Sequence, residues 1–394
     1  MTSEWRTIRA ADFIDFNPRL SLKKGDIATK VAMDKLKPFT KKIPETEKAE
    51  FNGGAKFCNG DTVMARITPC LENGKTAYVD MLDDGEIGFG STEFIVMRAK
   101  TGISDPQFVY YTAINPVFRN VAVKSMVGSS GRQRVQQSVL EELELSVPDL
   151  DEQRRIGDFL AKIDEKIALN DRINDNLEQQ AQSYFQELFV DNADPEWTTG
   201  TISDLGTVVG GSTPSKAKPE YYTESGIAWI TPKDLSINKS KFVSHGENDI
   251  TELGLKNSSA AIMPEGTVLF SSRAPIGYIA IAAGEVTTNQ GFKSVVPKPE
   301  IGTPFVYFFL KNTLPVIEGM ASGSTFKEVS GSTMKNVPAV IPDAETLAKF
   351  SDFCAPIFAQ QRILEEQNQS LATLRDNLLP KLMSGEIDVS AVQL

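Results

Sequence analysis

The longest regular pattern in the chain is a proline-free stretch over residues 152–189, in which inward positions recur alternately three and four residues apart. These inward positions are Leu160, Ile163, Ile167, Asn170, Asn174, Leu177, Ala181, Tyr184 and Leu188. Such spacing predicts a coiled-coil helix, because an ordinary surface helix has a broader apolar stripe. The helix would span roughly 55 Å at 1.5 Å per residue, and its seam needs a partner.

The partner helix lies in the same chain, which contains this pattern twice. A shift of 194 residues places Val147-Pro148-Asp149 on Ile341-Pro342-Asp343 and continues without a gap. In the second copy the seam includes Ile357, Leu364, Asn368 and Leu371. A repeat this long indicates a duplicated half-protein rather than a solenoid. We expect the two helices to pair antiparallel, because this arrangement puts a globular domain at each end. A two-fold axis between the layers of Asn170 and Asn174 would then place Asn170 opposite Asn368 and Asn174 opposite Leu364.

The sequence predicts an α+β protein built as a pseudo-two-fold tandem duplication. Its segments are a mainly β domain over residues 1–148, a helix over 149–195, a second mainly β domain over 196–342 and a second helix over 343–394. In the first domain the pairs Asn52-Gly53, Asn59-Gly60 and Asn73-Gly74 separate short apolar runs, a pattern that predicts β-hairpins. A chain of 394 residues is long enough for two domains that each bury a core.

The net charge of −11 is unevenly distributed. Residues 149–199 hold thirteen acidic and five basic side chains, and residues 343–388 hold eight and four, which leaves a net charge of +1 for the rest. The acid therefore lies on the helices. This division is consistent with globular parts that approach phosphate and helices that face protein partners. Solvated acidic helix faces are the more ordinary meaning of the same pattern.

The sequence indicates an intracellular protein without a membrane partner. No apolar run is long enough to cross a bilayer, and the N-terminus has no apolar segment behind a basic one. Cys58, Cys70 and Cys354 are odd in number and lack metal-ligand spacing, as expected of reduced thiols that pack in a cytoplasmic protein. We therefore expect a cytoplasmic location and no metal site.

The first domain offers two groups of candidate DNA-binding side chains. Lysines crowd its first third, and those chosen as candidates are Lys23, Lys24 and Lys41, to which we add Arg66. Such lysines can contact phosphate, although lysines mixed with acids in loops more often serve solubility. The loop over residues 128–134 supplies Ser129, Ser130, Arg132, Gln133 and Arg134. Arg and Gln can pair bidentately with purine edges in the major groove. A plain loop ending in a helix cap explains these residues equally well.

The second domain repeats the plan of the first with different polar loops. Its candidate DNA-binding residues are Ser212, Thr213, Lys233, Arg273, Thr288, Asn289, Gln290, Lys293, Ser324, Thr325 and Lys327. The loop that holds Lys327 occupies the place of the Arg132 loop under the shift of 194 residues. Two related domains with different polar side chains at matching positions indicate two readers of different targets, since a pair of enzymatic sites would repeat one chemistry.

Catalytic motifs are absent from the sequence. It has no Gly-rich loop ending in Gly-Lys-Ser/Thr, no Gly-x-Gly-x-x-Gly and no Asn-Pro-Pro-aromatic signature of amino-methylating enzymes. The one histidine, His245, has no second His or Cys near it, and both general-base and ligand roles need a second group within reach. We therefore expect a chain without catalytic residues.

The sequence resembles the specificity subunits of type I restriction-modification systems over nearly its whole length. The segments that carry the resemblance are Gly211-Ser212-Thr213-Pro214-Ser215, Ile227-Ala228-Trp229-Ile230-Thr231, Val268-Leu269-Phe270-Ser271-Ser272-Arg273-Ala274-Pro275-Ile276-Gly277, Thr288-Asn289-Gln290-Gly291-Phe292-Lys293, Gly323-Ser324-Thr325-Phe326-Lys327-Glu328-Val329-Ser330, the Pro-Asp-x-x-Glu-Gln-x-x-Ile start of the first helix and Leu379-Pro380-Lys381-Leu382-Met383-Ser384-Gly385-Glu386-Ile387. Their order, together with the tandem repeat, makes the resemblance specific.

The resemblance implies two target-recognition domains that each recognise one half of a split double-stranded DNA target, separated by two conserved helices. It also implies that two modification subunits, which methylate adenine, dock on the helices, and that restriction subunits join them. S-adenosylmethionine, ATP and Mg are then expected on these partner subunits, with no cofactor bound by this chain. The alternative from the sequence is a coiled-coil adaptor whose two domains bind proteins, and a steep fall of DNA binding with salt would favour the first interpretation.

Overall fold

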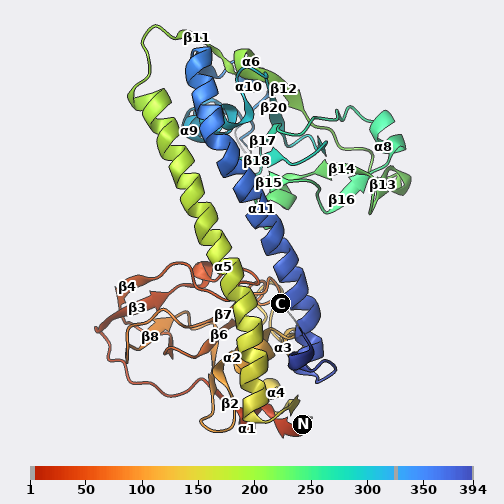
Figure 1. The fold of residues 1–394 in the computed structure, drawn as a ribbon. Helices are drawn as coiled ribbons and strands as arrows, with labels where there is room; N and C mark the ends of the chain where they lie inside the picture. Colours follow the sequence, from red (N-terminus) through yellow and green to blue (C-terminus); the bar gives the residue numbers. More distant parts are fainter. Residues whose placement is uncertain (1–4, 324–326, 393–394) are drawn as a thin grey trace. The chain divides into compact units, whose positions relative to one another are not determined.

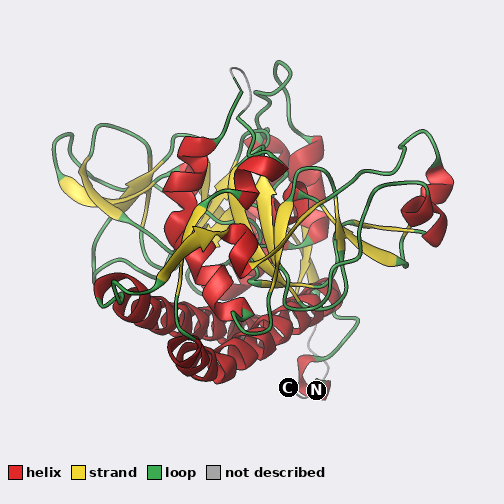
Figure 2. Ribbon diagram, turned by 90° about the horizontal axis from the view of Figure 1, so that it is seen from above, coloured by secondary structure: helices red, strands yellow, loops and turns green. Residues whose placement is uncertain are grey.

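The computed structural model describes residues 5–323 and 327–392. The chain divides into two compact units, Met1–Leu169 with Gln367–Leu394, and Asn170–Glu366. We call these the N-terminal unit and the C-terminal unit. Each unit takes part of both long helices, so the units divide the chain differently from the four segments predicted from the sequence. Strands and helices contribute to both units, as predicted for an α+β protein. Figure 2 distinguishes the helices from the strands by colour.

The N-terminal unit contains three sheets. A two-stranded sheet pairs β1 (Arg6–Arg9) with β10 (Glu144–Val147). A four-stranded sheet has the order β2 (Ile14–Phe16), β9 (Phe94–Ala99), β6 (Thr62–Ala65) and β7 (Thr76–Tyr78). A second four-stranded sheet has the order β4 (Glu47–Glu50), β3 (Ile27–Val31), β8 (Gly88–Gly90) and β5 (Ala55–Phe57). All four side chains of β6 are buried, so this strand is central to the unit.

Helices cover these sheets and complete the unit. They are α1 (Ala10–Phe13), the short η1 (Met33–Lys35), α2 (Pro106–Ile114), α3 (Pro116–Lys124), α4 (Gln137–Glu141) and η4 (Val389–Ala391). The Asp105 carboxylate accepts a hydrogen bond from the backbone N–H of Phe108, and Pro106 opens α2, a favoured helix start. The core of the unit joins α2 to both long helices through buried residues such as Phe108, Leu160 and Leu382.

The C-terminal unit repeats this plan. A two-stranded sheet pairs β11 (Thr198–Thr201) with β21 (Pro338–Ile341). A five-stranded sheet has the order β12 (Gly206–Gly210), β20 (Lys293–Pro297), β17 (Val268–Ser272), β18 (Ile276–Ala282) and β15 (Phe242–Val243). A four-stranded sheet has the order β13 (Tyr222–Thr223), β16 (Asn248–Ile250), β14 (Ile227–Ile230) and β19 (Thr287–Thr288).

The helices of the C-terminal unit also follow the plan of the first. They are α6 (Ile202–Leu205), η3 (Pro219–Tyr221), α7 (Pro232–Ile237), α8 (Glu252–Lys256), α9 (Thr303–Met320) and α10 (Gly331–Lys335). Strands β12, β20, β17 and β18 succeed one another in the same order as β2, β9, β6 and β7, and α9 follows β20 as α2 follows β9. The duplication predicted from the sequence is therefore a duplication of the fold.

The two repeated helices are α5 (Leu150–Gln186) and α11 (Ala344–Met383), coloured yellow to green and blue in Figure 1. A short π-helical segment, η2 (Glu187–Asp191), extends α5. Each helix begins after a Pro-Asp pair whose carboxylate caps it. Asp149 accepts from the N–H of Glu152 at 2.9 Å, and Asp343 accepts from the N–H of Thr346 at 2.9 Å.

The two helices run antiparallel within each unit. In the N-terminal unit Asp164 of α5 contacts Arg375 of α11, and further along α5 the Ile167 carbonyl accepts from Asn368. In the C-terminal unit the Asn174 carbonyl of α5 accepts from Gln361 of α11, and the ring of Tyr184 packs against that of Phe353 at a tilted angle. Residue numbers thus rise along α5 as they fall along α11, as predicted.

The seam positions lie against the unit cores. Leu160, Ile163, Asn170 and Ala181 are at most 1% exposed. Ile167, Asn174, Leu177, Tyr184, Leu188, Asn368 and Leu371 are half-buried, and Ile357 and Leu364 are buried. Asn170 and Asn368 belong to different units, so the predicted contact between these two residues stays a prediction.

The hairpin prediction for the Asn-Gly pairs is largely wrong. Asn73-Gly74 lies in the connection between β6 and β7, which are antiparallel neighbours. The connection through Asn52-Gly53 joins β4 and β5, which are not adjacent in their sheet, and that through Asn59-Gly60 joins strands of two different sheets. Gly53, Gly60 and Gly74 all have positive φ, and the chain bends at the first pair and turns at the other two, but a change of direction alone does not decide which strands pair.

Candidate nucleic-acid interface

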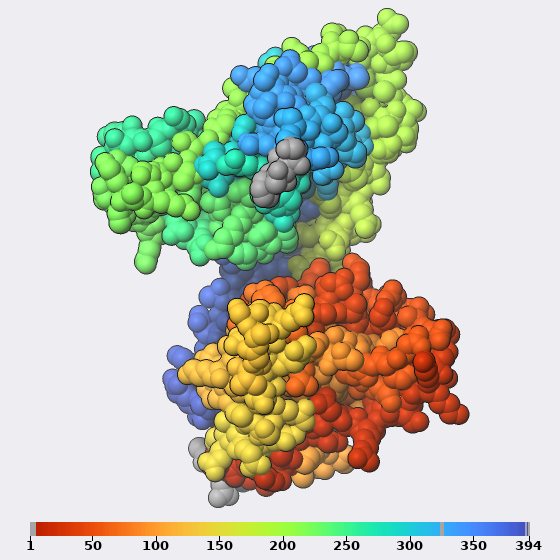
Figure 3. Space-filling view, turned by 180° about the vertical axis from the view of Figure 1, so that it is seen from behind, coloured from red at the N-terminus to blue at the C-terminus, as the bar shows by residue number. Residues whose placement is uncertain are grey.

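The C-terminal unit has an open cleft of about 480 Å³ that gathers polar side chains from loops far apart in the sequence. The segments around it, green to cyan, adjoin on the face shown in Figure 3. Five residues predicted from the sequence line the cleft: Thr213, Lys233, Arg273, Asn289 and Gln290. The sheet strands therefore bring separate loops into one site.

The turn between β19 and β20 supplies the amides of the cleft. The Asn289 side chain accepts a hydrogen bond from the N–H of Gly291 at 2.8 Å, which fixes the turn. Gln290 is exposed, and its side-chain oxygen accepts from the Thr213 hydroxyl. The amide group of Gln290 is thus oriented from one side while its other edge stays available to a ligand. An amide held in this way matches the bidentate edge of adenine.

Basic side chains with partial ion pairs lie beside the amides. Arg273 directly follows β17 and contacts Glu328 at 3.4 Å. Lys293 lies 3.9 Å from the same carboxylate, and burial lowers the pKa of Lys293 despite that neighbour. Lys327 is exposed and lies with Arg273 and Glu328 along a second hollow of about 620 Å³. One carboxylate therefore restrains two cations at a site where an incoming phosphate would compete for them.

Sequence reasoning missed several residues of the cleft. Lys216, Trp229, Thr231 and Asn248 also line it. Asn248 is exposed at the start of β16, so its amide can read a base edge, yet no motif in the sequence marked it. Trp229 donates from its indole N–H to the Ser212 carbonyl at 3.0 Å and holds that loop in place.

The exposed loop of the N-terminal unit connects α3 with α4. Ser129, Ser130 and Arg132 are exposed, and Gln133 is half-buried. Arg134 is exposed but forms a bidentate pair with Glu93 at 2.7–3.0 Å, which raises the pKa of the guanidinium. The loop thus presents hydroxyl, amide and guanidinium groups, and one of its two arginines is held by a carboxylate, as Arg273 is in the C-terminal unit.

The structure corrects several of the predicted site residues. Lys41 is 8% exposed and enclosed by the rings of Tyr78, Tyr110 and Tyr111, so it does not present its ammonium group to a phosphate. Thr288 is 1% exposed and lies beneath the turn that carries Gln290.

The remaining predicted residues are half-buried, exposed, or outside the described part of the chain. Arg66 is half-buried and donates to the Val135 carbonyl at 3.4 Å, so it supports the loop from behind. Ser212 is half-buried and accepts from the N–H of Ser259. Lys233 pairs with Glu247 at 2.5 Å at the edge of the cleft. Lys23 and Lys24 are exposed, away from the loop over residues 128–134 in sequence. Ser324 and Thr325 lie outside the described residues.

Two further features of the described chain bear on its class. Over residues 5–323 and 327–392, no helix combines the length and apolarity needed to span a membrane. Within the same residues no group of three His, Cys, Asp or Glu side chains could hold a metal ion. His245 is exposed and hydrogen-bonds with the Ser244 hydroxyl.

The fold and its loops define a protein with two related α+β domains, each presenting a different set of polar side chains and each packed against two antiparallel helices. The chain belongs to the family of the type I restriction modification DNA specificity domain, whose model matches residues 3–179 and again residues 195–374. The tandem match agrees with the duplication of the fold.

Proteins of the same family include named relatives. The chain is 39% identical over 194 residues to the type I restriction enzyme MjaIX specificity subunit of Methanocaldococcus jannaschii, an alignment that covers 47% of this chain and 45% of that protein. It is 24% identical to the HindI specificity subunit of Haemophilus influenzae, over 83% of this chain and 86% of that one. The chain thus spans less than half the length of MjaIX and most of HindI in these alignments.

A solved structure shares the fold. The S subunit of a type I restriction-modification system from M. genitalium is 18% identical, covers 96% of both chains and superposes with a TM-score of 0.57. At this identity the likeness establishes the fold alone, and it agrees with the two duplicated domains and long helices found here.

Proposed function

We propose that this chain is the DNA-specificity subunit of a type I restriction-modification complex. In this proposal each globular domain recognises one half of a bipartite DNA target, and the chain itself has no catalytic role. Methylation, translocation and cleavage belong to partner subunits, which bind S-adenosylmethionine, ATP and Mg.

The observation that carries the proposal is the doubled fold with two different sets of polar loops. In the C-terminal unit Arg273, Asn289 and Gln290 converge on one cleft, and these are the side-chain types that pair with base edges in the major groove. In the N-terminal unit Arg132 and Arg134 lie on an exposed loop between α3 and α4. This loop corresponds to the loop between α9 and α10 in the C-terminal unit. Lys327 lies on that corresponding loop of the C-terminal unit, so the side chains differ at corresponding places, which supports two different half-targets.

The outer faces of the long helices support the docking of two modification subunits. Apolar side chains remain exposed there, including Leu169 at 42%, Ile173 at 37%, Ile363 at 47% and Leu374 at 40%. In the C-terminal unit an open groove of about 450 Å³ between α5 and α11 is lined by Tyr184 and Phe353 and by polar side chains of α5 such as Gln180. Exposed apolar surface of this kind favours a protein partner over solvent.

The decisive experiment is to map methylated adenines in random-sequence DNA exposed to this chain together with its modification subunit. The proposal predicts methylation at two short sequences separated by a fixed gap. Methylation without sequence preference would overturn it. In parallel, the logarithm of the DNA-binding constant should fall linearly with the logarithm of the salt concentration. Salt-independent binding to protein partners alone would favour the adaptor interpretation instead.

A further inference from the structure

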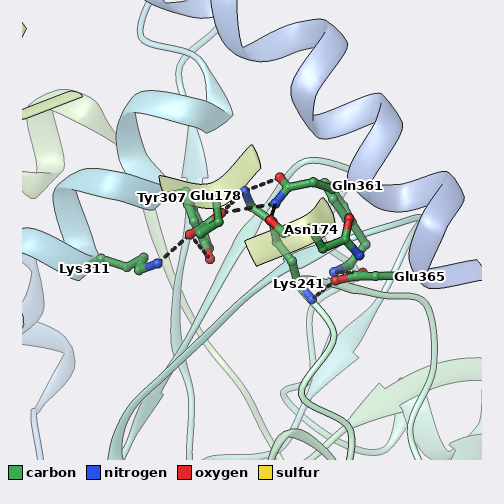
Figure 4. A network of polar contacts seen from close by, with 8 residues as sticks. Asn174, Glu178, Lys241, Tyr307, Lys311, Gln361 and Glu365 are labelled. Carbon is green, nitrogen blue, oxygen red and sulfur yellow. Dashed lines mark hydrogen bonds and ion pairs between the residues drawn. The ribbon is translucent and has the colours of Figure 1, made fainter. Parts of the chain in front are cut away.

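A buried polar cluster fixes the C-terminal globular domain to both long helices (Figure 4). Its centre is Lys241, which directly precedes β15 and has a side chain that is 6% exposed. The Lys241 ammonium group donates to Glu178 of α5 at 2.7 Å and to the side-chain oxygen of Gln361 of α11 at 2.8 Å. One side chain of the domain therefore contacts both helices at once.

Aromatic rings and a second lysine enclose this contact. The Lys241 ammonium group lies 3.6 Å from the ring centroid of Phe358 on α11 and 4.5 Å from that of Tyr307 on α9. The Tyr307 hydroxyl donates to Glu178 at 3.2 Å, and Lys311 of α9 also pairs with Glu178. Three groups of the domain thus converge on one carboxylate of α5.

Further bonds tie the cluster to α11 and across to α5. The Glu365 carboxylate accepts from the backbone N–H groups of Lys241 at 2.7 Å and Phe242 at 3.0 Å. The Gln361 amide donates to the Asn174 carbonyl of α5 at 3.2 Å. The start of β15 is therefore attached to α11 through its backbone as well as through a side chain.

The cluster tolerates displacement poorly. Burial lowers the pKa of Lys241 to about 8, and although burial raises the pKa of Glu178, Lys241 and Lys311 outweigh it and lower that pKa. The charge of each group therefore compensates for the hydration that the other loses on burial. A buried pair adds little net stability, but separating its members leaves uncompensated charge, so each shift of the domain along the helices is penalised.

In the N-terminal unit a cluster of different composition attaches the globular domain to the two helices. The Tyr111 hydroxyl of α2 donates to Asp164 of α5 at 2.6 Å, and Arg375 of α11 donates to the other oxygen of the same carboxylate at 2.6 Å. Under the shift of 194 residues Glu178 corresponds to Ala372, and Gln361 corresponds to Ile167. The attachment chemistry is therefore specific to each domain, although the fold is repeated.

We propose that Glu178, Lys241 and Gln361 are positioning residues for target spacing. They fix the position of the C-terminal domain on the helix pair and so restrict the gap between half-targets that the chain accepts. This inference rests on the proposed function. None of the three residues lines the cleft, so they act on the spacing and not on the bases that are read.

The physical link is the geometry of DNA. One added base pair moves the second half-target by about 3.4 Å and turns it by roughly 35° about the axis, since one helical turn is 34–36 Å and 10–10.5 base pairs. A domain that followed this movement would shift by several ångströms on its helices. Hydrogen bonds of 2.7–2.8 Å around Lys241 do not survive such a shift. The cluster therefore favours one gap length.

The test uses the full chain assembled with its modification subunit and a DNA library in which the gap varies by single base pairs. The variant Glu178→Gln removes the charge that Lys241 and Lys311 share. We expect it to keep both half-target sequences while methylation at gaps one base pair longer or shorter rises roughly tenfold relative to the cognate gap, equal to about 1.4 kcal/mol. Asp175→Asn, an exposed carboxylate three residues earlier on α5, is the matched control and should leave the gap preference unchanged.

A second variant separates positioning from stability. Glu178→Gln combined with Lys241→Met replaces the buried ion pair with uncharged groups and should regain thermal stability, because the deeply buried ammonium group is removed together with its partner. Lys311 also loses Glu178, but its side chain is 34% exposed and keeps contact with water. The proposal predicts that its gap preference nevertheless remains relaxed. An unchanged gap preference in this double variant overturns the proposal, as does a change in the bases recognised. If Glu178→Gln does not fold, Lys311→Gln, which leaves the Lys241–Glu178 contact intact, should relax the gap more weakly. Failure of the parent protein to methylate a specific site would instead refute the proposed function.

Discussion

Removing the carboxylate of Asp164 should destabilise the N-terminal unit strongly. The Asp164 side chain is 6% exposed and that of Arg375 is 7% exposed, so both members of this ion pair are buried. Asp164→Ala leaves the Arg375 guanidinium and the Tyr111 hydroxyl without this partner. Breaking a buried pair in this way costs about 3–5 kcal/mol.

The structure places the expected loss at the lower end of that range. Arg375 keeps a second contact with Asp376 at 2.8 Å, although that carboxylate is 61% exposed and so compensates only in part. We therefore expect Asp164→Ala to lower the free energy of unfolding of the N-terminal unit by about 3 kcal/mol. Replacing both partners, as in Asp164→Leu with Arg375→Met, should cost much less, because no buried charge is left uncompensated.

The assay must resolve one unit from the other, since a chain with two units does not unfold in a single two-state step. Native-state hydrogen exchange of the amides in α2 and in residues 150–169 of α5 reports the local opening free energy. Glu165→Ala, an exposed neighbour on α5, is the control and should change that free energy by less than about 0.5 kcal/mol. A loss below about 1 kcal/mol for Asp164→Ala would refute the reasoning.

Three further predictions concern DNA binding, spacing and pH. Arg273→Ala or Lys327→Ala should either lower the salt slope of DNA binding by about one, as for a lost phosphate contact, or relax one target position at about 1–3 kcal/mol; binding titrations that match the parent in both respects would place the DNA face elsewhere. Lengthening α5 and α11 by the same whole number of turns should widen the gap between half-targets, which methylation mapping would reveal, and an unchanged gap would count against the helices as a spacer. Burial lowers the pKa of Lys41 to about 8, so between pH 8 and 10 the unfolded chain binds more protons and the free energy of unfolding gains up to about 1.4 kcal/mol per pH unit from this group. The difference between the parent and Lys41→Met in unfolding experiments across that range isolates this contribution, and a difference independent of pH would contradict it.

The long helices and the duplication were predictable because their signals are local. The spacing of Leu160, Ile163 and Ile167 depends on neighbours one turn away, and the Pro-Asp caps at Asp149 and Asp343 act within three residues. Self-comparison of the sequence then aligns the two copies directly. The antiparallel sense followed from the need to place a domain at each end, and the contacts within both units agree with it.

Strand pairing and the burial of single lysines could not be predicted in this way. Asn59-Gly60 marks a turn correctly, but the sheet to which the next strand belongs is decided by side chains far along the chain. Lys41 resembled its exposed neighbours in the sequence, whereas the ring of Tyr111 that covers it lies seventy positions away. Asn248 escaped notice for the same reason, since only the folded sheet brings it into the same cleft as Gln290.

Lys241 and Lys41 show how a duplicated chain distinguishes its halves. Both lysines are enclosed by aromatic rings of the helix that follows the central sheet, Tyr307 of α9 and Tyr111 of α2. The acid that completes each cluster comes from α5 in both units, yet from positions fourteen residues apart, Asp164 and Glu178. A C-terminal domain placed on the N-terminal part of the helices would bury Lys241 without Glu178, a loss comparable to breaking a buried pair. The repeated fold therefore provides two domains of one architecture, and under the proposed function the unequal acids favour a different position on the helices for each domain.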